Sequence, residues 1–168
     1  WVWEMERRYG VLAKAGVRDI TSYNAWSLDH KKEAAAMGYP RMKYVICVID
    51  EYADMVMQDK KTGANEAQIV RLAQKARACG ITLIIATQRP SVDVISPTIK
   101  ANVPARIGLK TADANNSNIV MGTDDLATLM GNGDSWIKLT DGNMVRVQGP
   151  FITDPELDAI YDYLKKHY

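Results

Sequence analysis

Two adjacent acids, Asp50 and Glu51, stand directly after the apolar run YVICVI at residues 44–49. A run this short and this rich in β-branched residues predicts a fully buried strand of a parallel sheet. Acids at the carboxyl end of such a strand lie where open α/β sheets bind ligands. Asp50 could hold Mg²⁺, which prefers oxygen ligands, and Glu51 could orient or deprotonate an attacking water. The pair indicates nucleotide hydrolysis, although two solvated acids after a core strand fit this stretch alone equally well.

Polar side chains also follow the next predicted strand. Ile81–Thr87 is a second apolar, β-branched run, and Gln88 and Arg89 come directly after it. The intervening segment Glu66–Ala78 has apolar residues at the spacing of an amphipathic helix, which Gly80 is expected to end. Strand, helix and strand of this length predict a right-handed crossover between parallel strands.

The crossover would bring Asp50, Glu51 and Gln88 to one edge of one sheet. A strand-ending amide can hydrogen-bond both a water and a phosphate oxygen. Gln88 therefore suits a sensor of the γ-phosphate, with Thr87 as its partner in the nucleotide site. The alternative is that Thr87 and Gln88 only stabilise the turn before Pro90.

Several motifs, in this order, resemble the FtsK/SpoIIIE-type DNA translocases over about residues 3–164. They read EMERRYGVLAKAGVRDITSYN, VIDEYADM, RLAQKARACGITLIIATQRPSVDVISPTIKANVPARI, GNGDSWIKL and VRVQGPFITDPEL. The resemblance implies an α/β fold with a RecA-like P-loop NTPase core, in which helices flank a mostly parallel sheet and a β-hairpin and a helix follow. It also implies a homo-hexameric ring that moves double-stranded DNA with ATP and Mg²⁺.

The resemblance assigns roles to individual residues. Asp50 would hold Mg²⁺ and the nucleotide, and Glu51 would be the catalytic base. Arg77 falls where related ring motors carry an arginine finger, a cation that reaches the ATP of a neighbouring subunit. The alternative for Arg77 is a cation placed favourably at a helix C-terminus. Arg106, in ANVPARI, is the second candidate finger.

The resemblance also places Arg89 and Lys100 on pore loops that touch the DNA backbone. Such charges follow phosphates without reading sequence, and ordinary surface charge is the alternative. The family usually has lysine where Ala114 stands and arginine where Asn118 stands. Two DNA contacts are therefore expected to be missing, and Lys110 is the nearby cation that remains.

The phosphate-binding motif G-x-x-x-x-G-K-[ST] does not occur in the 168 residues. In the family this loop lies upstream of the EMERRY helix. We therefore expect residues 1–168 to be the C-terminal portion of a single RecA-like motor domain. We also expect the isolated chain to be inactive, because the amides and the lysine that hold the phosphates are not in it.

The composition of the chain excludes several classes of protein. Lys and Arg number 21 and Asp and Glu number 20, a formal charge of +1 that excludes a grossly basic nucleic-acid binder. No apolar stretch approaches the length of a membrane helix and no signal peptide is visible. A membrane anchor, which such translocases often carry, would lie outside this chain. Cys47 and Cys79 lack metal-type spacing and indicate reduced, packed thiols of a cytoplasmic protein.

Other elements are predicted from periodicity and turn residues. The pattern predicts helices at 2–15, 115–121 and 153–166, a helix at 91–101 broken near Pro97, a strand at 103–110, a hairpin of 134–139 with 144–148, and a polar link at 55–65.

Two further functions stay open: a related secretion ATPase that moves polypeptide, and a non-catalytic assembly or DNA-binding module. The sequence does not separate chromosome segregation from conjugative DNA transfer.

Overall fold

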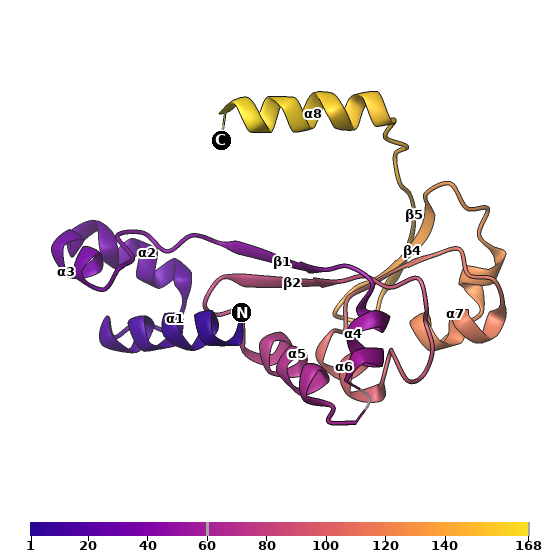
Figure 1. Cartoon of the computed structure of the whole chain (residues 1–168), viewed down its shortest axis with the longest axis horizontal. Coiled ribbons are helices and arrows are strands. Elements are labelled where there is room, and N and C mark those ends of the chain that lie inside the picture. Colours follow the sequence, from indigo (N-terminus) through magenta and orange to yellow (C-terminus); the bar gives the residue numbers. More distant parts are fainter. Residues whose placement is uncertain (60, 168) are drawn as a thin grey trace. The chain divides into compact units, whose positions relative to one another are not determined.

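The computed structural model describes residues 1–59 and 61–167. The chain divides into two compact units, one from Trp1 to Val103 and one from Pro104 onward (Figure 1). Both combine helices with a small sheet, so the predicted α/β class is confirmed. Throughout the described part of the chain, no helix combines the length and the apolar character that crossing a bilayer requires.

In the first unit, β1 (Val45–Ile49) and β2 (Ile81–Ile85) pair in parallel and in register. Between them the chain forms α4 (Tyr52–Gln58) and α5 (Ala64–Lys75), which confirms the predicted order of strand, helix and parallel strand. The remaining helices are α1 (Val2–Lys14), α2 (Ile20–Asp29), α3 (Lys31–Ala36) and α6 (Pro97–Asn102).

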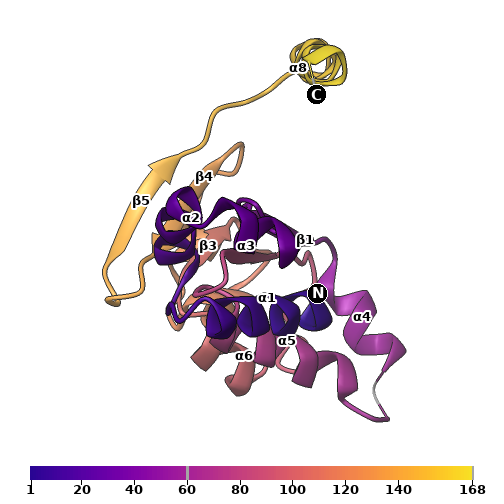
Figure 2. The ribbon, with the colours of Figure 1, turned by 90° about the vertical axis from the view of Figure 1, so that its left-hand side faces the viewer.

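Within the described residues of the first unit, helices cover one face of the β1–β2 pair. Cys47 and Ile81 pack into a core with residues of α1, α2 and α5, and α1 and α5 lie together on that side of the strands (Figure 2). Side chains alternate between the faces of a strand, so the intervening residues point the other way. Among them, Ile46 is 66% exposed, Val48 62% and Ile84 46%. The prediction of a fully buried strand is therefore wrong for this chain.

Three helices differ from the predictions by more than one residue. Helix α4 occupies the start of the predicted polar link and begins directly after the two acids. Helix α5 ends at Lys75, and residues 76–80 form a turn that leads into β2. Pro97 is the first residue of α6 and does not kink a longer helix, because the Ser96 side chain caps this end by accepting a hydrogen bond from Ile99 N.

The second unit holds the antiparallel strands β3 (Arg106–Leu109), β4 (Asp134–Lys138) and β5 (Met144–Gln148) in that order. The predicted hairpin is confirmed as β4–β5, and β3 pairs with its first strand. Helix α7 (Ala114–Met121), the 3₁₀ helix η1 (Asp125–Thr128) and α8 (Asp154–His167) complete the unit.

An ion pair between the buried Asp134 and the exposed Arg146 connects the two strands of the hairpin. Arg146 donates to both carboxylate oxygens of Asp134, at 2.9 and 2.7 Å, and Met130 N donates to one of them. Asp134 is almost completely buried. These hydrogen bonds, that of Arg146 first, lower the pKa of Asp134 to about 2.

Candidate functional site

The carboxyl ends of β1 and β2 lie next to each other, because the strands are parallel and in register up to Ile49 and Ile85. Backbone hydrogen bonds continue past both strands. Ala86 N donates to Ile49 O at 2.9 Å, and Tyr52 N donates to Ala86 O at 2.8 Å. The acids that follow β1 and the polar residues that follow β2 are therefore neighbours, as the sequence predicts.

The Glu51 carboxylate is held by the end of β2. The Thr87 hydroxyl donates to Glu51 Oε1 at 2.6 Å, and the backbone N–H of Gln88 donates to Oε2 at 3.2 Å. The hydrogen bond from Thr87 is the main cause that lowers the pKa of Glu51 below its ordinary value. Glu51 is therefore held in its ionised carboxylate form.

The backbone of Glu51 has the left-handed conformation, with φ 46° and ψ 66°. A non-glycine residue adopts it at a cost of about 1–3 kcal/mol, and only where the surroundings hold it there. Glu51 immediately precedes α4, so this conformation sets the turn from strand to helix. Strain of this kind concentrates at functional sites.

Asp50 is exposed, and its Oδ1 accepts a hydrogen bond from Glu51 N at 3.0 Å. Within residues 1–59 and 61–167, no group of three or more His, Cys, Asp or Glu side chains is arranged to hold a metal ion. Mg²⁺ in nucleotide sites usually takes one or two carboxylates together with phosphate oxygens and water. A single exposed carboxylate fits that kind of donor set, and it does not fit an all-protein cage.

The predicted DNA-contacting residues of the first unit lie after β2 and on α6. Arg89 is exposed, and its guanidinium lies 3.9 Å from an Asp54 carboxylate oxygen and 3.8 Å from the Met57 sulfur. Its backbone N–H donates to Thr87 Oγ1 at 3.1 Å. Lys100 lies in the last turn of α6 and is half-buried.

Arg77 does not join this cluster. It is exposed in the turn between α5 and β2, at the end of β2 opposite to Thr87. Its carbonyl accepts a hydrogen bond from Gly80 N. Because α5 ends at Lys75, Arg77 lies beyond the helix and not within its last turn.

The remaining candidates belong to the second unit. Arg106 donates to Val120 O at 2.9 Å, and burial lowers its pKa although a guanidinium stays charged. Lys110 is exposed just after β3. Ala114 and Asn118 are exposed one turn apart on α7, and the Asn118 amide donates to Ala114 O at 2.9 Å.

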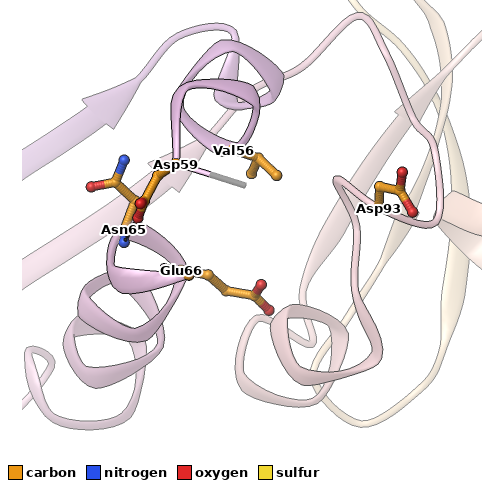
Figure 3. A pocket seen from close by; sticks show the side chains of 6 residues that line it. Val56, Asp59, Asn65, Glu66 and Asp93 are labelled. Atoms are coloured by element: carbon orange, nitrogen blue, oxygen red, sulfur yellow. Dashed lines mark hydrogen bonds between the residues drawn. The ribbon is translucent and has the colours of Figure 1, made fainter. Parts of the chain in front are cut away.

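A cavity of about 300 Å³ lies elsewhere in the first unit (Figure 3). The described lining residues are Val56, Asp59, Gly63, Asn65, Glu66 and Asp93. The described lining includes none of Asp50, Glu51, Thr87 and Gln88, so the cavity is separate from the strand-end cluster.

Sequence reasoning missed two features of the strand-end cluster. It placed Thr87 beside Gln88 in the nucleotide site but did not name Glu51 as the partner of its hydroxyl. It also missed Asp54 as the partner of Arg89, because no local pattern connects residues 35 positions apart. The spacing of apolar residues was enough to predict that Asp50, Glu51 and Gln88 follow neighbouring strands. The partners of their side chains depend on the turn after each strand, which that spacing does not describe.

The fold is that of P-loop ATPase motor domains, as its similarity to solved structures shows. A solved structure of the pCW3 conjugation coupling protein TcpA, in its monomer form with ATPgS, is 28% identical, with a TM-score of 0.72. The similarity covers 99% of this chain and 46% of that one. The cytoplasmic domain of the type VII secretion ATPase EccC of Thermomonospora curvata gives a TM-score of 0.76 at 22% identity, over 98% of this chain and 19% of that one, and shows the fold alone.

The chain belongs to the FtsK/SpoIIIE family, whose sequence model matches residues 1–92. The DNA translocase FtsK of Bacillus cereus is 42% identical over 162 residues, which is 96% of this chain and 20% of that protein. The DNA translocase SftA of Bacillus subtilis is 41% identical over 163 residues, 96% of this chain and 16% of that protein. The chain thus spans about a fifth of the length of these relatives.

Proposed function

We propose that this chain is part of an ATP-driven motor that translocates double-stranded DNA. The observation that carries the proposal is the cluster at the ends of β1 and β2, where Thr87 and Gln88 hold the Glu51 carboxylate beside Asp50. The DNA substrate is inferred from relatives that are named DNA translocases and are 41–42% identical over 96% of this chain.

Each residue of the cluster has a role in hydrolysis. Asp50 would hold Mg²⁺, and Glu51 would orient the attacking water and accept its proton. Gln88 would sense the γ-phosphate. Mg²⁺ bound with ATP supplies positive charge to the phosphates. Arg77 would complete the site of a neighbouring subunit, with Arg106 as the second candidate.

The assembly is proposed in the same way. The two units would together form part of one RecA-like motor domain, and its subunits would form a homo-hexameric ring around DNA on the cytoplasmic side. Any membrane segment would lie outside this chain. The isolated chain would hydrolyse ATP poorly, because its sequence has no phosphate loop. Chromosome segregation and conjugative DNA transfer are the two versions of this role.

The test measures ATP hydrolysis by the longer natural protein that contains this chain, with and without double-stranded DNA. We expect DNA to stimulate hydrolysis. Hydrolysis that is independent of DNA and stimulated by a polypeptide would instead support a secretion motor. A protein that binds DNA without hydrolysing ATP would support a non-catalytic module.

Glu51→Gln in the same protein tests the catalytic base. The amide keeps the shape of the side chain but cannot accept the proton of water, so we expect turnover to fall by roughly 10²–10⁴-fold while ATP still binds. Glu33→Gln, at an exposed position of α3, is the matched control and should leave turnover unchanged. Near wild-type turnover of Glu51→Gln would contradict the assignment.

A further inference from the structure

We propose that Thr87 is a positioning residue for the catalytic base: its hydroxyl orients the Glu51 carboxylate, and the Arg89 backbone amide fixes that hydroxyl. The sequence places Thr87 in the nucleotide site as the partner of Gln88 and does not predict this role. The inference rests on the proposed function, because it takes Glu51 to be the base.

The direction of the hydrogen bonds follows from the chemistry of the groups. A carboxylate has no proton to donate, so the 2.6 Å contact requires the Thr87 hydroxyl to donate to Glu51. Its length is that of a charge-assisted O–H···O⁻ bond. The Arg89 N–H, 3.1 Å away, donates to the same Thr87 oxygen and occupies one of its acceptor positions. The amide and the hydroxyl therefore form one directed chain that ends on Glu51.

The second carboxylate oxygen of Glu51 is held independently. Gln88 N–H donates to it at 3.2 Å, so two donors from consecutive residues fix the plane of the carboxylate. An ionised carboxylate has about four acceptor positions, and these two contacts leave the others for a water molecule. The arrangement orients Glu51 without blocking it.

Glu51 needs such support because its own backbone is strained. Its side chain is long and only partly buried, so its rotamer is not fixed by packing alone. Misplacing a catalytic group by 1 Å can lower the rate by roughly 10²-fold. Loss of the Thr87 hydroxyl should therefore reduce the chemical step and not the binding of ATP.

The first test compares Thr87→Val, which keeps the shape and removes the hydroxyl, with Thr87→Ser, which keeps the hydroxyl. In the longer protein we expect Thr87→Val to lower kcat by roughly 10–10²-fold with KM for ATP little changed, and Thr87→Ser to restore most of kcat. Thr82→Val, at an exposed position of β2, is the matched control. Equal losses in the Val and Ser variants, or a rise in KM alone, would overturn the inference.

The second test needs neither ATP nor turnover. Hydrogen exchange of single amides should accelerate in Thr87→Val at Arg89, which loses its acceptor, and at Gln88, whose carboxylate partner is released. Thr87→Ser should protect both amides as the wild type does. Unchanged exchange at Gln88 in Thr87→Val would show that Thr87 does not hold Glu51. If the Val variant misfolds, Thr87→Ala replaces it.

The proposed function and the positioning role of Thr87 would be contradicted by different results. A wild-type protein without ATPase activity would remove the proposed function, and the positioning role with it. An active wild type in which Thr87→Val behaves like Thr87→Ser would remove the positioning role alone.

Discussion

Arg77 and Glu51 lie at opposite ends of the parallel strand pair. The five residues of β2 span about 16 Å, at roughly 3.3 Å per residue, which is longer than an arginine side chain. A guanidinium in the turn before β2 therefore cannot reach the site of its own chain. This position fits the proposal that Arg77 acts on the site of a neighbouring subunit.

Arg77→Ala should abolish most ATP hydrolysis, because an arginine finger contributes roughly 10³–10⁵ in rate. Mixing Arg77→Ala subunits with subunits that lack a working phosphate loop should restore part of the activity, since each defect then affects a different interface. Hydrolysis by the mixed rings is the measurement. A loss of less than about tenfold (some 1.4 kcal/mol) in pure Arg77→Ala would count against the finger, and Arg106 would be tested next.

At the scale of elements, periodicity predicted what depends on local sequence. The strands β1 and β2, the body of α5 and the β4–β5 hairpin all follow from apolar spacing and turn residues. Helix α4 was missed because it is short and begins after Glu51, whose backbone conformation is unusual for that residue type. The covering of only one face of β1 was also missed, since it depends on which helices pack against it.

Gly80→Ala should destabilise the first unit. Gly80 has φ +75°, and an added Cβ would lie 2.2 Å from Ile20 Cδ1. The backbone strain alone should lower the free energy of unfolding by about 1–3 kcal/mol, and the displacement of Ile20 should lower it further. Gly10→Ala is the matched control, because Gly10 lies in α1 with open space around the new Cβ. This variant should raise the free energy of unfolding by about 0.5–1 kcal/mol. Chemical denaturation measures both, and a stable Gly80→Ala variant would contradict the contact.

The Asp134–Arg146 pair predicts acid sensitivity of the second unit. The folded-state pKa of Asp134 is about 2, below the ordinary 3.8, so the ion pair stabilises the fold above the unfolded-state pKa. That contribution is lost as the pH falls from about 4 to about 2. Asp134→Asn should lower Tm at neutral pH. Its Tm should then fall less than that of the wild type as the pH is lowered from about 4 to about 2. Asp158→Asn, on exposed α8, should leave the acid profile steep, and an equally steep profile in Asp134→Asn would contradict the prediction.

At the scale of the whole chain, the charge is nearly balanced, with a formal net charge of +1. The proposed binding to DNA would then depend on local cations and not on a general positive field. Arg89 already has a carboxylate neighbour, Asp54, at 3.9 Å. On α7, the exposed positions Ala114 and Asn118 carry no charge. Weak and only moderately salt-dependent DNA binding is the expected result.

Adding Ala114→Lys together with Asn118→Arg should tighten DNA binding and make it more sensitive to salt. Each added phosphate contact steepens the slope of log affinity against log salt by roughly 0.9, without sequence preference. The measurement is DNA affinity over a range of salt concentrations. Ala35→Lys with Ala36→Arg adds the same charge near the end of α3 as a control. An unchanged slope in the α7 variant would show that this helix does not face DNA.

The left-handed backbone of Glu51 also has a consequence for protein engineering and for selection. Judged by stability alone, glycine or asparagine would suit this position better than glutamate. Redesign of this chain for heat resistance would tend to replace Glu51, and on the proposed function the more stable protein would lack its catalytic base. A glutamate at a position that suits glycine better is what selection for activity at the expense of stability would produce.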